Sequence, residues 1–172
     1  MLHSTLVGIT GHLRIYTVRP DGTITCVSDK KNRITDLHLQ ALASLISQTP
    51  AIVSPAELAI DRMDVEAHPT TIMAADRSNT GPDPAATIAK SYVFDKNADV
   101  TVFGGTPGLL EFRAEIGPNE APGSVLRAAG MYTAGDGAGG TPLLVCRQTF
   151  APITKENGLG IRLDWEIEYS IQ

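Results

Sequence analysis

The sequence is poor in aromatic residues and in cysteine, and both shortages limit what the chain can be. Only 5% of its 172 residues are aromatic, whereas 42% are hydrophobic, which is enough for a real core and makes global disorder unlikely. The 16 glycines and 11 prolines indicate many turns, which favours strands and loops over a helical bundle. Cys26 and Cys146 stand too far apart for a metal-binding or redox motif. Both are predicted to be buried thiols, with a disulfide within or between chains as the alternative.

Clustered positive charge and long apolar runs are also lacking. The net charge is −5 and the longest basic run is Lys30-Lys31, which argues against a nucleic-acid-binding groove. No stretch approaches the roughly 20 apolar residues of a membrane-spanning helix. The opening Met-Leu-His-Ser does not resemble a signal peptide, because no basic segment precedes an uninterrupted apolar one. We therefore expect neither a nucleic-acid nor a membrane partner.

The clearest pattern in the chain is its last one, over residues 161–171. Six apolar residues, the single Trp165 among them, alternate with one basic, three acidic and one serine residue. Successive side chains of a strand point to opposite faces, so a period of two predicts a long strand with one buried and one solvated face. Burying six large apolar side chains contributes on the order of 10–15 kcal/mol before entropy is counted. We expect the fold to be built on this strand.

One hairpin and one helix are predicted in the first third of the chain. Residues 12–28 form two alternating runs around Pro20-Asp21-Gly22, a turn in which proline presets φ and glycine accepts positive φ. The hairpin either pairs with the main sheet or projects as an arm. We expect deletion of residues 1–28 to leave a folded core and to weaken assembly. Residues 35–48 carry leucines at helical spacing, with Thr35 or Asp36 as the N-cap.

Shorter alternating segments fill the rest of the chain. They predict strands over residues 57–63, 88–93, 100–103, 109–116, 125–132 and 143–150. The stretch 67–85, with several prolines, is predicted to be a loop at the surface or at a subunit contact. Four successive strands at the C-terminal end indicate an antiparallel meander or Greek key.

These elements define a mainly β fold. We predict an antiparallel β-sandwich-like domain over residues 32–172, with one packed amphipathic helix, and an N-terminal β-hairpin or arm over residues 1–31. The helix is expected to lie against an apolar face of a sheet.

No residue is assigned a catalytic, cofactor-binding or metal-binding role. The four histidines have no His or Cys at the spacing of a zinc site, and His38 is interpreted as a partly exposed or capping residue. Asp61, Asp64 and Glu66 could suggest a glycosidase pair, but acids near a strand end are more often a solvated face. The glycine-rich stretch 135–140 lacks the Lys-Ser/Thr of a phosphate loop and is interpreted as a hairpin tip.

The acidic face of the last strand supports one structural hypothesis. Like charges two residues apart, at Asp164, Glu166 and Glu168, repel one another unless cations lie opposite. Arg147 or Arg113, from a neighbouring strand or an adjacent subunit, could provide these cations. Plain solvation of the three acids is the alternative.

Three pieces of the sequence carry a resemblance to a known group of proteins. They are the Asn-x-Ile-Thr opening of the helix at residues 32–35, the Gly-Pro-Asn-Glu-Ala-Pro-Gly-rich block at residues 117–132, and Phe-Ala-Pro-Ile-Thr-Lys at residues 150–155. Together they resemble small structural proteins of tailed bacteriophages, of the neck, collar, tail or fibre-attachment type. The resemblance covers most of residues 32–172 and rests on turns and strand faces. An alanine, Ala128, stands where the group often has an acidic residue.

The resemblance implies a non-enzymatic structural subunit that assembles with itself and with other virion proteins, without a cofactor. Its location would be the virion, after synthesis in the bacterial cytoplasm. The alternative is a carbohydrate-binding β-sandwich module for host-surface recognition, which would need exposed aromatic side chains. An enzyme acting on glycan or peptidoglycan ranks third.

Overall fold

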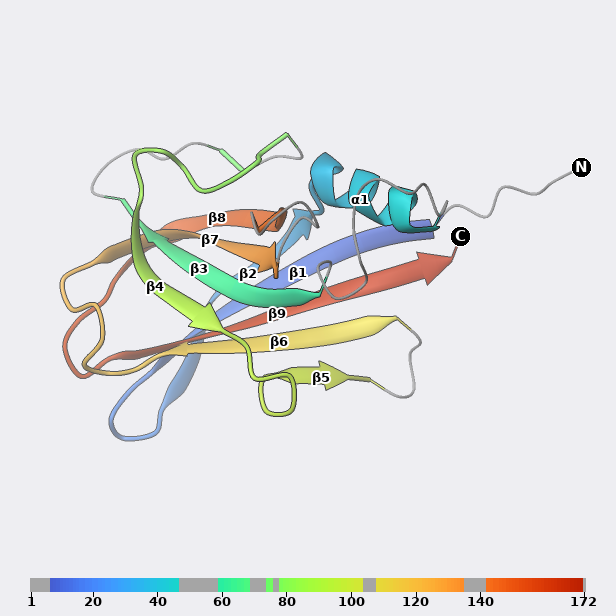
Figure 1. Cartoon of the computed structure of the whole chain (residues 1–172). Coiled ribbons are helices and arrows are strands. Elements are labelled where there is room, and N and C mark those ends of the chain that lie inside the picture. Colours follow the sequence, from blue (N-terminus) through green and yellow to red (C-terminus); the bar gives the residue numbers. More distant parts are fainter. Residues whose placement is uncertain are drawn as a thin grey trace, which may run out of the picture.

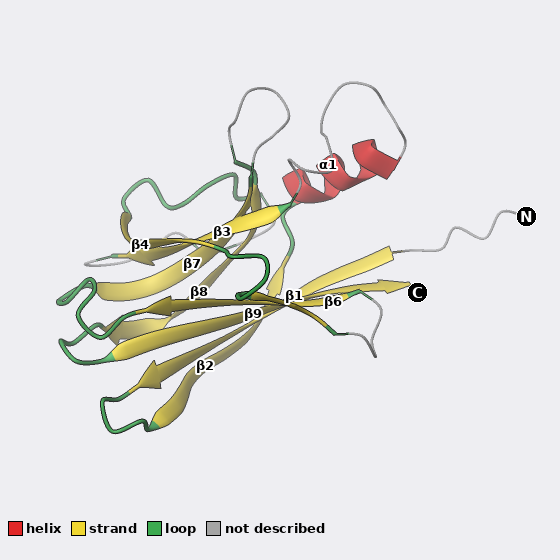
Figure 2. Ribbon diagram, turned by 60° about the horizontal axis from the view of Figure 1, so that its bottom comes forward, coloured by secondary structure: helices red, strands yellow, loops and turns green. Residues whose placement is uncertain are grey.

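The chain folds as two antiparallel sheets stacked as layers, with one helix (Figures 1 and 2). The structure, a computed structural model, describes residues 7–46, 59–68, 74–75, 78–103, 108–134 and 142–171. The first sheet has the order β2-β1-β9-β6-β5, from Ile24–Arg33, Val7–Val18, Gly160–Ile171, Leu109–Ile116 and Val100–Val102. The second has the order β4-β3-β7-β8, from Thr87–Val93, Ile60–Ala67, Val125–Thr133 and Leu144–Thr154. The predicted mainly β, sandwich-like fold is confirmed.

Strand β9 lies at the centre of the five-stranded sheet, as its sequence predicted. It pairs with β1 on one side and with β6 on the other, antiparallel in both cases. Trp165 is fully buried and donates its indole N–H to Asn32 Oδ1 at 3.1 Å. A side chain at Gly11 would collide with this Asn32 carboxamide, so β1 needs a glycine there. The apolar side of β9 is therefore fixed by packing and by one buried polar contact.

The core fills the space between the two sheets. Alternate residues of each strand point inward, which is the pattern of a sandwich with two outer polar faces. The five-stranded sheet contributes buried side chains including Leu13, Ile15, Phe112, Ile116, Ile161, Leu163, Trp165 and Ile167. The four-stranded sheet contributes buried side chains including Met63, Val65, Leu126, Met131, Val145, Cys146 and Phe150.

The N-terminal hairpin belongs to the main sheet rather than projecting from it. Strand β1 pairs with β9 from Val7↔Ile171 to Val18↔Gly160, and its Leu13 and Ile15 are fully buried. This pairing and burial argue against the expectation that residues 1–28 can be removed from a folded core. Strand β2 forms the edge of the sheet and pairs with β1 through a bulge at Val27.

Helix α1 spans Asp36–Ile46 and lies at the end of the sandwich where β1 begins and β9 ends (Figures 1 and 2). Thr35 caps it as predicted, because its Oγ1 accepts a hydrogen bond from the His38 amide at 3.3 Å. The same hydroxyl donates to the Leu144 carbonyl, which ties the helix start to β8. Residues 47–48 of the predicted helix lie outside the described residues. His38 is 2% exposed, so its interpretation as a partly exposed residue is wrong.

Two predictions about the strands also change. The strand predicted over residues 57–63 is β3, which runs from Ile60 to Ala67 and carries Asp64 and Glu66 within it. The C-terminal strands do not form a meander, because the chain crosses between sheets from β6 to β7 and from β8 to β9. Strand β9 can enter the five-stranded sheet between β1 and β6 only because of this second crossing.

Candidate functional site

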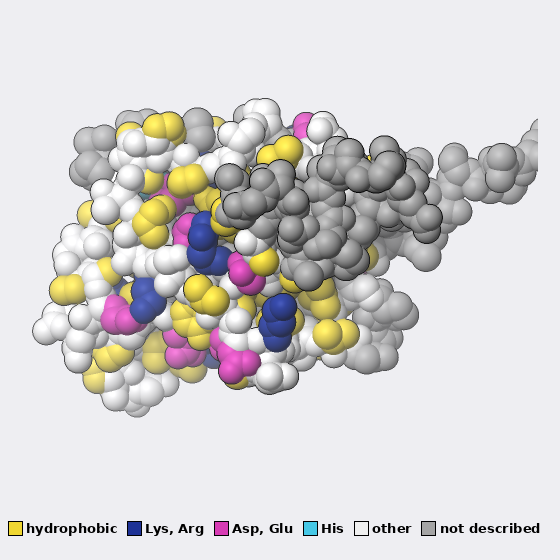
Figure 3. Space-filling view, viewed as in Figure 1, with side chains coloured by type: hydrophobic (Ala, Val, Ile, Leu, Met, Phe, Trp, Pro, Cys, Tyr) yellow, Lys and Arg dark blue, Asp and Glu magenta, His cyan; other side chains and the backbone are white. Residues whose placement is uncertain are grey.

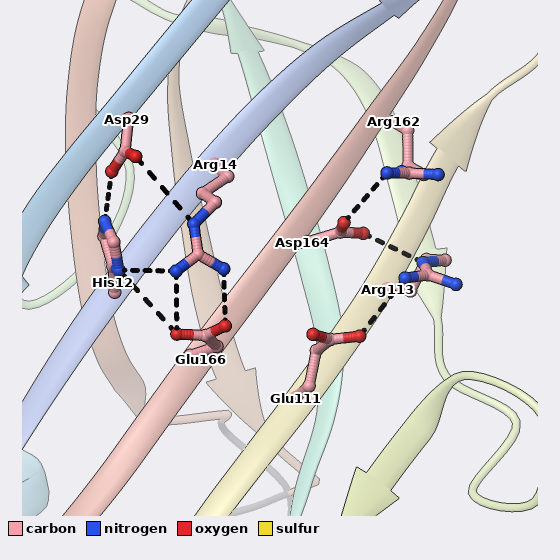
Figure 4. A network of polar contacts seen from close by, with 8 residues as sticks. All are labelled: His12, Arg14, Asp29, Glu111, Arg113, Arg162, Asp164 and Glu166. Atoms are coloured by element: carbon pink, nitrogen blue, oxygen red, sulfur yellow. Dashed lines mark hydrogen bonds and ion pairs between the residues drawn. The ribbon is translucent and has the colours of Figure 1, made fainter. Parts of the chain in front are cut away.

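The outer face of the five-stranded sheet carries a network of ion pairs (Figure 4). Glu166 on β9 accepts hydrogen bonds from both terminal nitrogens of Arg14 on β1, at 2.5 and 3.3 Å. His12, two residues before Arg14, bonds to Asp29 on β2. The hydrogen bond to Glu166 raises the pKa of Arg14, so this guanidinium stays charged. One half of the network thus joins β2, β1 and β9.

The other half of the network joins β9 to β6. Asp164 accepts a hydrogen bond from Nε of Arg113 at 2.9 Å and lies 3.3 Å from Arg162. Arg113 also reaches Glu111 on its own strand at 3.2 Å (Figure 4). The Arg162 guanidinium stacks over the ring of Tyr16 at 4.5 Å. This outer face is therefore lined by charges that are already paired.

The hypothesis of cations opposite the acidic face is confirmed for Asp164 and Glu166. Arg113 is one of the two predicted partners, whereas Arg14 and Arg162 were missed. The other predicted partner, Arg147, is wrong, because it lies in the other sheet. Glu168 is exposed. The pairing reduces the repulsion between neighbouring carboxylates and holds adjacent strands in register.

Arg147 takes part in a buried ion cluster on the outer side of the four-stranded sheet. Its Nε and Nη2 donate to the two carboxylate oxygens of Glu66 at 2.7 and 2.6 Å, and both side chains are 0% exposed. His68 Nε2 lies 3.0 Å from Glu66, and its Nδ1 lies 4.0 Å from Asp83. Such a pair is stable in a dry site only if both charges remain together.

The remaining acids of β3 are also held by neighbours. Asp64 accepts a hydrogen bond from Ser91 at 2.6 Å and lies 3.2 Å from Arg62. Arg62 in turn lies over the ring of Tyr132 at 4.8 Å. Burial raises the pKa of the Tyr132 phenol. The interpretation of Asp64 and Glu66 as a solvated face is therefore wrong, and both acids are used inside the fold rather than in an open cleft.

Lysine 155 connects two of the sequence blocks that carry the phage resemblance. Its ammonium donates to the carbonyls of Pro118 and Glu156, at 2.8 and 3.2 Å, and the residue is fully buried. Its backbone pairs with Gly123 and Ser124 of the same turn. Desolvation lowers the pKa of the Lys155 amine. The turn of residues 117–124 and the segment 150–155 thus form one structural unit.

The two cysteines differ in their surroundings. Cys146 is fully buried, and burial raises the pKa of its thiol, so it is unreactive in the folded chain. Cys26 is exposed on β2, which corrects its prediction as a buried thiol. Both are free thiols, and no disulfide joins them.

His38 gives the chain a pH-dependent stability. Burial lowers its pKa to about 4, and neither ring nitrogen has a hydrogen-bond partner among the described residues. In the unfolded chain, the His38 imidazole therefore binds a proton below about pH 6.5. In the folded chain it binds this proton only below about pH 4, so stability falls as the pH drops between these values. We expect stability to fall by about 3 kcal/mol across this window relative to the variant His38→Leu. Urea unfolding of both proteins between pH 7 and 4 measures this; parallel curves would contradict it.

Two hollows accompany the edge strands. One of about 460 Å³ lies between the β1–β2 hairpin and the β8–β9 turn, with Thr25, Val27 and Leu159 among its lining residues. Another of about 230 Å³ lies where β2 meets β8, beside Lys31, Arg33 and Arg147. The largest aromatic side chain, Trp165, is buried away from both. No Trp, Tyr or Phe is among the described residues that line either hollow, so neither presents the aromatic rings on which a sugar stacks.

The described residues show neither a metal site nor a membrane-spanning helix. The described residues contain no group of three or more His, Cys, Asp or Glu side chains placed to hold a metal ion. None of the helical segments among them has the length and apolarity needed to cross a membrane. The glycine-rich stretch 135–140 and His3 lie outside the described residues.

Comparison with known proteins gives no relative. No family model matches the chain, and no curated protein and no solved structure matches it. What the chain does must therefore be argued from its own residues.

Proposed function

We propose that this chain is a non-enzymatic structural subunit of a tailed-phage particle, of the neck, collar, tail or fibre-attachment type, and that it acts by assembling with copies of itself. The observation that carries the proposal is how the polar residues are used. Both groups of paired charges, on the outer faces of the two sheets, join strands to one another. None of these groups lines the hollow of about 460 Å³ beside the β1–β2 hairpin, and of the buried cluster only Arg147 borders the hollow of about 230 Å³, among the described residues.

The unit built around Lys155 supports the same proposal. Two of the three blocks that carry the phage resemblance, residues 117–132 and 150–155, are joined by the buried ammonium of Lys155, which donates to turn carbonyls. A buried ammonium without acceptors would cost free energy of folding, so these two hydrogen bonds hold the lysine and the turn together. The arrangement therefore fixes a turn at one end of the sandwich. The exposed edge strands β2 and β4 then provide surfaces on which a neighbouring subunit could add a strand.

Size-exclusion chromatography with light scattering on the purified chain tests the proposal. We expect a discrete closed oligomer, from trimer to dodecamer, that persists on dilution to micromolar concentration. A monomer at every concentration would contradict self-assembly and would raise the standing of the carbohydrate-binding alternative. A glycan-binding screen on that monomer would be the next measurement.

A further inference from the structure

The two lateral sides of the sandwich both end in edge strands. On one side β2 borders the five-stranded sheet and β8 borders the four-stranded sheet; on the other side the borders are β5 and β4. Directly after β2, Ile34 forms an isolated bridge with Cys146 of β8. Residues 24–31 of β2 therefore pair only with β1 among the described strands. Strand β4 likewise pairs only with β3.

The exposed large hydrophobic side chains gather on these edges. Among the described residues there are six, and each lies on an edge strand or directly after one: Ile24 (52%), Val27 (42%), Ile88 (39%), Val93 (69%), Val102 (69%) and Phe103 (38%). Two lie on β2, two on β4, and two on or next to β5. Exposed apolar residues scattered singly over a surface are ordinary. These six are instead confined to two opposite edges of the sandwich, which makes these edges the candidate contact surfaces.

The charge of β2 indicates what kind of partner it contacts. Its ten residues contain three cations and one carboxylate, a net charge of +2. The whole chain carries −5, so the rest of it carries −7. A second copy of this chain is thus an electrostatically favourable partner for β2. The one charged side chain of β4, Lys90, is already paired with Glu120 at 2.5 Å, so it does not repel an approaching β2.

The same facts argue against a two-fold contact of β2 with β2 of a second copy. Such a contact would bring two net-positive strands together and would leave the apolar residues of β4 and β5 uncovered. A head-to-tail contact joins a cationic edge to a neutral one and covers both apolar edges of every subunit. Heterologous contacts of this kind generate closed rings when the rotation between subunits closes.

We infer that copies of this chain join head to tail, with the β2 edge of one copy adding to the β4 edge of the next. The inference rests on the proposed function, for which it names the interface. Figure 3 shows the face that carries β4. Hydrophobic side chains are exposed there, among basic and acidic side chains that lie next to one another. The seven residues of β4 could pair with seven of residues 24–31 of β2, whose outer edge pairs with no other described strand. Such a contact would be about 24 Å long.

Two variants that each block one edge test the inference. Val27→Lys places a charge on the β2 edge, and Val93→Lys does the same on the β4 edge. Each variant alone is expected to be monomeric, with the dissociation concentration raised at least about tenfold. Mixed in equal amounts, they are expected to form a heterodimer, because each still has the edge that the other needs. Glu168→Gln, which changes the net charge equally on the outer face of β9, is the control and should assemble normally.

Each outcome decides between the inference and the proposed function. A heterodimer from two monomeric variants supports the head-to-tail contact, and it also shows that both variants are folded. If wild type assembles and Val93→Lys assembles equally well, β4 is not the contact and the inference fails while the proposed function stands. If both variants are folded by circular dichroism but their mixture stays monomeric, the inference is likewise overturned. If wild type itself is monomeric, the proposed function fails, and the inference with it.

Discussion

Deleting residues 1–28 is expected to unfold the chain completely. The deletion removes β1, which separates β2 from β9 and pairs with β9 along its whole length. It also removes Leu13 and Ile15, both fully buried, and exposes one side of Trp165's strand. Each lost aliphatic side chain costs about 2–5 kcal/mol, which together approaches the entire stability of a domain this size. Circular dichroism and thermal unfolding of the truncated chain measure the result; a cooperative transition near that of wild type would contradict it.

Point variants within β1 separate its packing role from its charge network. Leu13→Ala is expected to lower the free energy of unfolding by about 2–5 kcal/mol, because Leu13 faces the core and is 0% exposed. His12→Ala, one residue earlier and on the outer face, is expected to cost less than about 1 kcal/mol, since its ion pair with the exposed Asp29 is wet. Equal losses for the two would mean that β1 does not sit in the core as described.

The strand alternations could be predicted from the sequence because they depend on local periodicity. Strand β9 shows this best: its period of two identified both its inner residues and its outer acids, and the structure confirms both. The cap at Thr35 was also predictable, because a side-chain oxygen at that position satisfies an amide of the first helical turn. Local rules therefore found the elements, although the start of β3 moved by three residues.

Long-range pairing could not be predicted in the same way. The sequence left open whether the N-terminal hairpin pairs with the sheet, and the answer depends on β9, about 150 residues later. One partner of the acids of β9, Arg14, also comes from β1, and its local sequence gives no sign of the pairing. Burial of His38 and exposure of Cys26 were missed for the same reason, since neither follows from neighbouring residues alone.

One signal in the sequence did point to the buried ion cluster and was misread. Arg147 follows the apolar run Leu144, Val145 and Cys146, where a charge must either reach solvent or meet a buried partner. It was assigned to the acidic face of β9, but the structure pairs it with Glu66 on the other sheet. A charged residue within an apolar run thus predicts that a buried partner exists, but it does not tell which residue that partner is.

Replacing Arg147 with methionine is expected to lower the free energy of unfolding by about 3–5 kcal/mol. Methionine has a similar length and fills the space of the arginine stem, so the loss is not mainly a cavity effect. It comes from Glu66, which is 0% exposed and would lose the guanidinium that contacts both of its carboxylate oxygens, with His68 as its remaining printed partner among the described residues. Urea unfolding at pH 7 measures the change. Glu66→Gln is expected to cost a similar amount, because it removes the buried carboxylate that accepts both printed hydrogen bonds of the Arg147 guanidinium.

The double variant Glu66→Gln, Arg147→Met distinguishes a lost ion pair from a general disturbance of the sheet. With both members of the pair removed, neither leaves the other buried with its charge unmatched, so the double variant should be more stable than either single variant. Arg113→Met is the matched control, because Arg113 also pairs with an acid on a neighbouring strand but is 46% exposed, and it should cost less than about 1 kcal/mol. Additive losses in the double variant would show that the two side chains act independently. The buried pair would then be a result of the way the sheets pack, and its two charges would not hold β3 and β8 to each other across β7.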